Sequence, residues 1–127
     1  MPEDISMIKQ YSFEKLEIWD LTLGLIKRIY QLARKLPKDE SIGLAGQMKR
    51  AVVSIALNIA EGRASDSDAE FRRYLGISLK SLIEVMACLK VSLFLNMIKT
   101  NEADDIFLLC DKLEAKIRSF RRTLRGA

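Results

Sequence analysis

The chain has 127 residues, of which 49% are apolar and 30% are charged, and its net charge is +4. This composition is typical of a globular protein and excludes a disordered one. No run of about 18 apolar residues is free of charge, which excludes a transmembrane helix. The chain contains no histidine, which excludes histidine-based metal sites and histidine-dependent catalytic triads. The N-terminus also lacks the pattern of a signal peptide, so we expect one cytoplasmic domain without metal or cofactor.

The first predicted helix spans about residues 14–36, after a flexible lead-in of residues 1–12 that lacks periodicity. Apolar residues recur in it at spacings of 3 and 4, which predicts one buried face. This face consists of Leu16, Trp19, Leu23, Ile26, Tyr30 and Ala33. We expect Trp19 to anchor the core rather than to stack on a base. Pro37 ends the helix, because the residue before a proline avoids the helical region.

The second predicted helix, about residues 40–62, is apolar around most of its circumference, as in a helix that is buried on most sides. Asp39 or Ser41 is the expected N-cap, and Gly62 is expected to close the helix. Five polar residues at spacings of 3 or 4 fall within roughly a quarter of the circumference. This polar seam consists of Gln47, Arg50, Ser54, Asn58 and Glu61.

The polar seam has two interpretations. It is either a solvent-facing stripe or set of hydrogen bonds between helices, or it lines a pore, groove or binding surface in an assembly. None of its residues is a good nucleophile with a base beside it. The seam therefore predicts no reaction and no catalytic residue.

The third predicted helix, about residues 67–95, opens with a capping box in which Ser67 precedes Glu70. Its apolar surface is wider than one contact in a bundle requires, because Leu79, Ile83 and Phe94 extend it beyond the main apolar face. The additional surface is either a subunit interface or part of a wide core stripe.

The fourth predicted helix spans about residues 101–123, with Thr100 or Asn101 as its cap. Asn96 in the preceding turn is a candidate for a left-handed backbone. Acidic residues lie early in the helix and cations late, which matches the helix dipole. Four helices of about 20 residues with short loops predict an all-α, up-down-up-down antiparallel four-helix bundle.

Positive charge gathers at the C-terminal end of the chain. From Lys112 onward six basic residues accompany one acid, Glu114, whereas the other 15 basic and 16 acidic residues nearly cancel. This basic arm consists of Lys112, Lys116, Arg118, Arg121, Arg122 and Arg125. It suits contact with nucleic acid, an anionic lipid surface or an acidic protein. The alternative is a solvated final helix whose cations stabilise its own C-terminal end.

The two cysteines, Cys88 and Cys110, each lie in an apolar helical pattern and form no CxxC pair. We expect two reduced core thiols. A disulfide is the alternative that spacing alone does not exclude.

Several motifs follow one another in a fixed order between residues 13 and 98. They are Phe13-x-x-Leu16-x-x-Trp19, Leu36-Pro37-x-x-Glu40, Gly43-Leu44-x-x-Gln47-x-x-Arg50-Ala51-x-x-Ser54-Ile55-x-x-Asn58-Ile59-Ala60-Glu61-Gly62, Phe71-x-x-Tyr74-Leu75 and Ser81-Leu82-x-Glu84. With them the chain resembles the four-helix-bundle family encoded in intervening sequences of bacterial 23S rRNA genes. It departs from the family at Asn96, where glycine is usual, and at Leu79 and Lys80, where small residues are common.

The resemblance implies a homo-pentamer in which bundles form a ring around a central channel. A related branch is the accessory protein of diversity-generating retroelements, which works with a reverse transcriptase and binds nucleic acid. The family has no established enzymatic activity, and the resemblance implies none here.

We therefore expect a non-enzymatic oligomer that binds RNA or DNA through its basic arm. Little sequence preference is expected, because the chain shows no base-reading motif. The alternative is a protein-interaction adaptor, such as an accessory subunit for a reverse transcriptase. An enzyme is disfavoured, because di-metal sites in bundles use Glu-x-x-His pairs.

Overall fold

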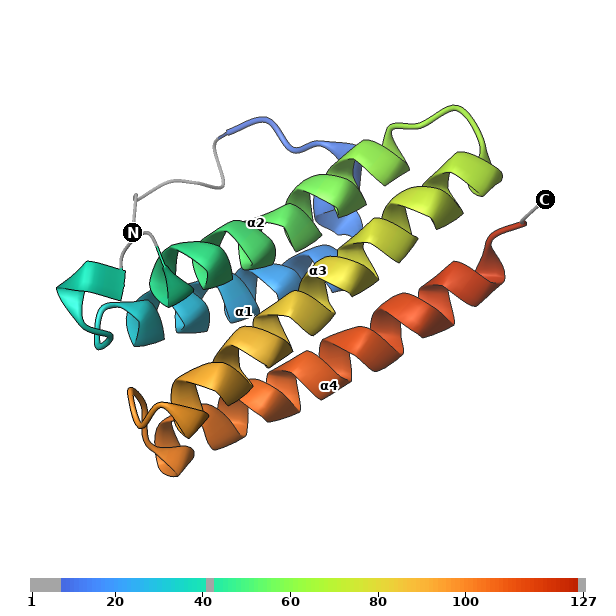
Figure 1. The fold of residues 1–127 in the computed structure, drawn as a ribbon. Helices are drawn as coiled ribbons and strands as arrows, with labels where there is room; N and C mark the ends of the chain where they lie inside the picture. Colours follow the sequence, from blue (N-terminus) through green and yellow to red (C-terminus); the bar gives the residue numbers. More distant parts are fainter. Residues whose placement is uncertain (1–7, 41–42, 126–127) are drawn as a thin grey trace.

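The computed structural model describes residues 8–40 and 43–125, and within these ranges the chain is all-α. Four long helices, α1 (Glu17–Ala33), α2 (Leu44–Arg63), α3 (Asp68–Phe94) and α4 (Thr100–Thr123), are joined by loops at alternating ends of the molecule (Figure 1). Two short 3₁₀ helices, η2 (Ser12–Lys15) and η3 (Lys38–Glu40), precede α1 and α2. The expected all-α fold of four helices is therefore confirmed.

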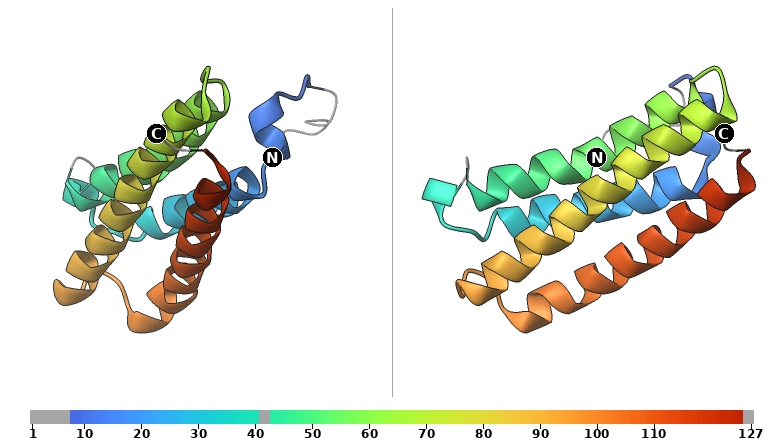
Figure 2. Two further views of the ribbon diagram at one scale, coloured as in Figure 1. Left: turned by 90° about the vertical axis from the view of Figure 1, so that its right-hand side faces the viewer. Right: turned by 45° about the vertical axis from the view of Figure 1, so that its right-hand side comes forward.

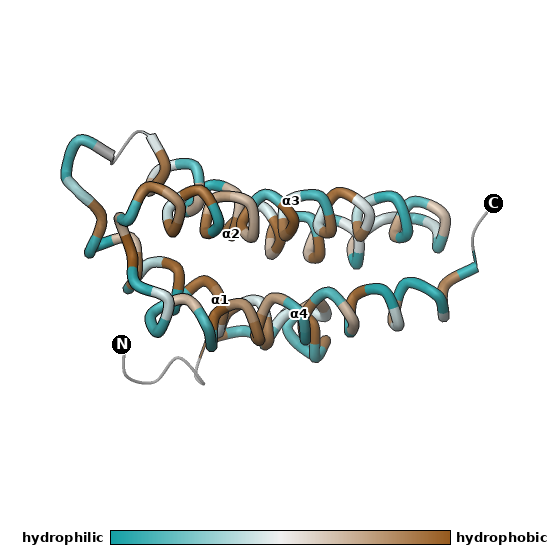
Figure 3. The backbone as a smooth tube through the Cα atoms, turned by 60° about the horizontal axis from the view of Figure 1, so that its bottom comes forward, coloured by the Kyte–Doolittle hydropathy of each residue, from teal (hydrophilic) through white to brown (hydrophobic). Residues whose placement is uncertain are grey.

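Each long helix packs against two others. Helix α2 lies against α1 and α3, and α4 lies against the same two helices on the side away from α2 (Figure 2). The pairs α2–α3 and α1–α4 form two layers (Figure 3). One core fills the space between the layers, and its largest fully buried side chains include Leu25, Ile29, Met48, Ile55, Ile59, Leu75, Leu82, Leu89, Ile106, Leu113 and Ile117.

The buried face of α1 differs from the one that the sequence predicts, and Ala33 is the only member that the two faces share. The helix buries Ile18, Thr22, Leu25, Ile29, Leu32 and Ala33. In contrast, Leu23 is 44% exposed and Tyr30 is 38% exposed. Two apolar stripes run along this helix. The stripe that faces the core contains the polar Thr22, so it is the less regular of the two in the sequence. Burial of Thr22 is tolerated because its hydroxyl donates a 2.6 Å hydrogen bond to the Ile18 carbonyl.

Helix α1 is shorter than the predicted range of 14–36. Residues Ser12–Lys15 form the separate helix η2, where the Tyr11 amide donates to the Glu14 carboxylate at 2.7 Å. The extended backbone of Leu16 separates η2 from α1. Side-chain packing preserves part of the predicted stripe, because Leu16 and Trp19 are partly buried against the core. Of the expected lead-in, residues 1–7 lie outside the described residues.

Helix α2 also differs from its prediction at both ends. It begins at Leu44 with Gly43 as N-cap, while Asp39 belongs to η3 and Ser41 lies outside the described residues. At the other end the helix continues to Arg63, so Gly62 does not close it. No glycine among the described residues has a positive φ.

Gly62 is buried where α2 meets the start of α3. A Cβ atom at Gly62 would lie 2.7 Å from Cδ1 of Phe71 and 2.9 Å from Cβ of Tyr74. Both distances are shorter than real Cβ contacts. The absence of a side chain, and not backbone freedom, therefore explains this glycine.

The ends of the last two helices follow local capping rules. The hydroxyl of Ser67 accepts from the Glu70 amide at 3.1 Å, which confirms the N-cap half of the predicted capping box, whereas the Glu70 carboxylate accepts from Arg73. Asn96 has a φ of 59°, which confirms the left-handed turn. The N-cap of α4 is Lys99 rather than Thr100 or Asn101. The reason is that the Lys99 amide donates to the Glu102 carboxylate at 2.8 Å, which fixes the start of the helix.

Candidate functional site

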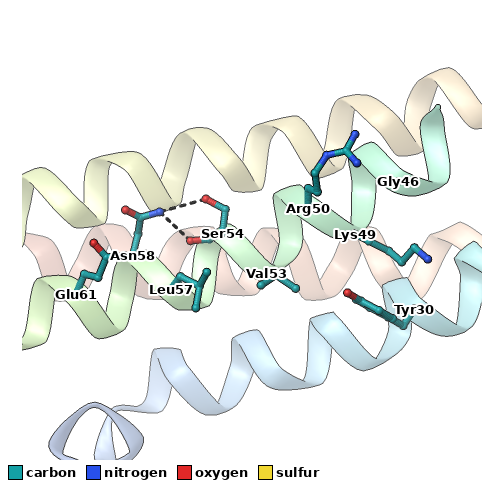
Figure 4. A pocket seen from close by; sticks show the side chains of 9 residues that line it. All are labelled: Tyr30, Gly46, Lys49, Arg50, Val53, Ser54, Leu57, Asn58 and Glu61. Carbon is teal, nitrogen blue, oxygen red and sulfur yellow. Dashed lines mark hydrogen bonds between the residues drawn. The ribbon is translucent and has the colours of Figure 1, made fainter. Parts of the chain in front are cut away.

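Helix α2 presents most of its polar seam to an open groove on the outside of the bundle. The groove has a volume of about 580 Å³ and lies between α2 and Tyr30 of α1 (Figure 4). Gln47 is the one seam residue that does not line it. The lining consists of Tyr30, Gly46, Lys49, Arg50, Val53, Ser54, Leu57, Asn58 and Glu61.

The middle of the polar seam is hydrogen-bonded to α3. The amide of Asn58 donates to the Ser54 carbonyl at 2.9 Å and to the Ser54 hydroxyl at 3.1 Å. Ser54 in turn accepts a 3.0 Å bond from Ser81 of α3. One turn away, the fully buried Ser78 donates to the Ile55 carbonyl at 2.9 Å. These bonds satisfy polar groups where the two helices pack closely.

The N-terminal end of the seam connects two charged groups through Gln47. The side-chain amide of Gln47 donates to the Glu84 carboxylate of α3, and its oxygen accepts from Arg50 at 3.1 Å. Gln47 and Ser54 thus fit the interpretation of bonds between helices. Arg50 and Glu61 are exposed and line the groove, which fits a solvent-facing stripe, and a role of the seam in an assembly stays a prediction.

The groove carries opposite charges at its two ends. Lys49 and Arg50 lie at one end and Glu61 at the other, with Leu57 between them (Figure 4). Lys49 also rests over the Tyr30 ring, with its Nζ 5.5 Å from the ring centroid. Leu57 is 54% exposed. The groove therefore combines an apolar centre with opposite charges at its two ends.

Two cations of the basic arm are paired within the chain. The Nζ of Lys116 lies 3.4 Å from the Glu17 carboxylate of α1. Arg118 pairs with Glu114 one helical turn before it, at 2.9 Å. Exposed pairs of this kind contribute little to folding.

The remaining basic residues are less constrained, apart from Arg121. Lys112 and Arg122 are exposed, and neither makes an ion pair or a side-chain hydrogen bond with the described residues. Arg125 follows α4, and its backbone amide donates to the Asp68 carboxylate at 3.0 Å. Unpaired cations therefore remain at both ends of the basic arm.

Arg72 of α3 joins the basic arm in space although sequence reasoning missed it. Its Nη1 donates to the Arg121 carbonyl at 2.7 Å and approaches the Leu124 carbonyl at 3.5 Å. In return, the Nε of Arg121 donates to the Arg72 carbonyl at 2.9 Å. Only the packing of α3 on α4 brings these two arginines together, so no local sequence signal could have found Arg72.

The arginines surround a small surface hollow. Its volume is about 100 Å³, and its lining consists of Arg72, Arg118, Arg121 and Arg122. The arginine hollow is thus the place where the basic arm is most concentrated.

Several large apolar side chains remain exposed on the outer face of α3 and on α4. Phe94 is 85% exposed, Ile83 is 48% exposed and Leu108 is 69% exposed. By contrast, Leu79 is buried within the core. The wide apolar surface of α3 is therefore partly core and partly exposed.

The cysteines are free and buried, as expected. Burial raises the pKa of the Cys110 thiol to about 12, and nearby Asp111 and Glu114 add to the effect. Burial raises the pKa of Cys88 as well. Neither thiol is suited to act as a nucleophile near neutral pH.

Residues 8–40 and 43–125 contain no cluster of acidic residues and cysteines that could hold a metal ion. None of the helices in these ranges combines the length and the apolar character needed to cross a bilayer.

Comparison with known proteins agrees with the motif pattern. The family described as 23S rRNA-intervening sequence protein matches residues 14–119. A similar solved structure is that of a protein of unknown function from the S23 ribosomal protein family of Bacteroides thetaiotaomicron. It is 24% identical, with a TM-score of 0.76 over 83% of this chain and 95% of the other, which shows a shared fold. No curated protein matches the chain.

Proposed function

The chain belongs to the 23S rRNA-intervening sequence protein family, and from this premise we propose that it is a non-enzymatic, cytoplasmic protein that binds RNA or DNA. Its basic arm contacts the phosphate backbone with little sequence preference. The observation that carries the proposal is the gathering of Arg72, Arg118, Arg121 and Arg122 around one hollow. Such a concentration of cations attracts phosphates and releases their counterions.

The proposal includes assembly of the up-down-up-down bundle into a ring-shaped homo-oligomer, a pentamer by family resemblance. Two exposed apolar regions support it: the groove beside Tyr30 and Leu57, and the outer face of α3 at Ile83 and Phe94. Apolar patches of this kind mark interaction sites. A contact between two different faces closes into a ring when the rotation between copies allows it. Five copies of the segment from Lys112 onward, each with six basic residues and the acid Glu114, would carry about +25 on one assembly.

The test is RNA binding by a variant in which Lys112, Arg118, Arg122 and Arg125 are all changed to Gln. Arg121 is retained, because its side chain bonds the backbone of α3. A matched control changes Lys27, Arg34, Lys38 and Arg63 to Gln, which removes the same charge from exposed positions elsewhere.

Fluorescence anisotropy with a labelled oligouridylate at several salt concentrations measures the effect. The basic-arm variant should bind at least about tenfold more weakly at low salt, with a salt slope reduced by up to about 3, since each phosphate contact on a single strand contributes about 0.7. The control variant should bind nearly as the parent does. Equal losses in both variants would show that the arm is not the site.

A second candidate function is a protein-interaction adaptor, such as an accessory subunit for a reverse transcriptase. The groove on α2 favours it, because its apolar centre and charged ends suit a segment of another protein. A stable oligomer that leaves RNA unbound at low salt would favour this candidate over the first.

A further inference from the structure

The arginine hollow has a geometry that goes beyond a diffuse positive surface. It draws Arg72 from α3 and Arg118, Arg121 and Arg122 from α4. Arg72 and Arg121 hold each other in place, because each donates a hydrogen bond to the other's backbone carbonyl. Two of the guanidinium groups are therefore positioned before any ligand arrives, which lowers the entropy cost of binding.

The fixed arginines keep most of their donors free. A guanidinium group has five N–H donors. Arg72 uses its Nη1 for the carbonyls of α4, and Arg121 uses its Nε for the carbonyl of α3. Arg122 makes no hydrogen bond with the described residues and can turn toward the hollow. Enough donors remain for bidentate contact with an oxyanion.

Charge in the hollow is poorly balanced by the protein itself. Four arginines line it, and two carboxylates lie nearby: Glu114, bonded to Arg118, and Asp68, which lies one turn before Arg72 and accepts from the Arg125 amide. The C-terminal end of α4 adds only a partial negative charge, from carbonyls that Arg72 already binds. Like charges this close favour an added anion. The hollow is small, at about 100 Å³, which suits a single oxyanion such as one phosphate group.

We propose that the arginine hollow is a binding site for one phosphate group. Arg72 and Arg121 act as its fixed wall, and Arg122 closes on the anion. The nucleic-acid source of the phosphate rests on the proposed function, in which one backbone phosphate would occupy the hollow and set the position of the strand. Free inorganic phosphate presents the same chemistry and is the other source.

Gly76 of α3 leaves room for the side chain of Arg121. A Cβ atom at this position would lie 3.3 Å from Nη2 of Arg121, so the guanidinium group packs directly over the glycine. A substitution there would displace the Arg121 guanidinium group by a few tenths of an ångström.

The decisive comparison is between Arg122→Gln and Arg34→Gln. Both arginines are exposed, both lack partners among the described residues, and both changes remove one charge without breaking an internal bond. Arg34 lies just after α1, at the end of the bundle opposite the C-terminal end of α4 (Figure 1). If Arg122→Gln lowers the affinity more than Arg34→Gln does, the difference therefore comes from the hollow and not from the lost net charge.

Two probes distinguish the sources of phosphate. With labelled oligouridylate, Arg122→Gln should reduce affinity about tenfold, whereas Arg34→Gln should change it less than twofold. With sodium phosphate at constant ionic strength, the arginine Nε–H signals in ¹H–¹⁵N spectra of the full chain should shift in the parent and not in Arg122→Gln. A shift with phosphate but no binding of RNA would identify a free-phosphate site and refute the proposed function alone.

The proposal fails if the parent binds RNA but both variants lose affinity equally, because the arm would then act as a diffuse charge. It also fails if phosphate shifts no arginine signal and Arg122→Gln binds oligouridylate with the same affinity as the parent. An Arg72→Gln variant provides a second check, with circular dichroism to confirm that α4 keeps its helix content. If that variant is folded and binds RNA as the parent does, the fixed wall has no role.

Discussion

Gly62→Ala tests whether the contact between α2 and α3 depends on a missing side chain. The added Cβ would lie 2.7 Å from Cδ1 of Phe71 and 2.9 Å from Cβ of Tyr74. The Phe71 ring can shift, but Cβ of Tyr74 is attached directly to the backbone of α3. The two helices would have to separate or the local packing would have to distort.

The expected cost follows from two opposing effects. Replacing glycine by alanine inside a helix normally stabilises it by about 1 kcal/mol, whereas overpacking a close contact costs about 1–3 kcal/mol. Because the backbone-attached atom cannot move freely, the cost should lie in the upper part of this range, at about 2–3 kcal/mol, which leaves a net loss of about 1–2 kcal/mol. Gly24→Ala is the matched control, since nothing lies within 4 Å of its Cβ position in the middle of α1. That change should stabilise the protein by about 0.5–1 kcal/mol.

Urea denaturation of the parent and both variants, at one protein concentration because assembly would shift the midpoint, measures the two effects. The midpoints should move in opposite directions. If Gly62→Ala stabilises the protein as much as Gly24→Ala does, α2 and α3 do not pack as closely at Gly62 as the structure indicates.

Three further predictions concern single buried or half-buried groups. Cys110 has a thiol pKa raised to about 12, so its stabilising effect is complete below the ordinary thiol pKa near 8.5 and falls by up to about 1.4 kcal/mol per pH unit above it. Urea denaturation should show that the free energy of unfolding falls less between pH 8 and 10 in Cys110→Ala than in the parent. An equal fall in both proteins would contradict this. Thr22→Val should change stability by less than about 1 kcal/mol by the same measurement, because the Ile18 carbonyl keeps its helical partner; a larger loss would mean that the hydroxyl is required. Asn58→Leu removes the bonds to Ser54 and should lower the mass of the assembly in light scattering more than it lowers RNA affinity, whereas normal mass with lost RNA binding would make the seam a binding surface.

The sequence predicts the helices well because their signals are local. Spacings of 3 and 4, the capping box at Ser67 and the left-handed Asn96 each depend on residues within one or two turns. The face of α1 could not be chosen in the same way, since two apolar stripes compete and the buried one contains Thr22. For a related reason the sequence predicts the wrong role for Gly62: a glycine near a helix end usually closes the helix, and only the position of Phe71 reveals the contact.

In the candidate site, too, the residues on a single helix are predictable from the sequence, whereas their partners on other helices are not. The polar seam and the basic arm follow from spacing and composition on single helices. Their partners come from other helices, as with Glu84 for Gln47 and Ser81 for Ser54. Arg72 is separated from Arg121 by 49 positions, and no periodicity links residues that far apart.

The most direct test of the central claim is light scattering coupled to size exclusion, with and without a structured RNA, at low and high salt. The account predicts a stable oligomer, about fivefold the mass of the chain, that takes up RNA at low salt and releases it at high salt. A monomer, or an oligomer that ignores RNA at every salt concentration, would contradict it.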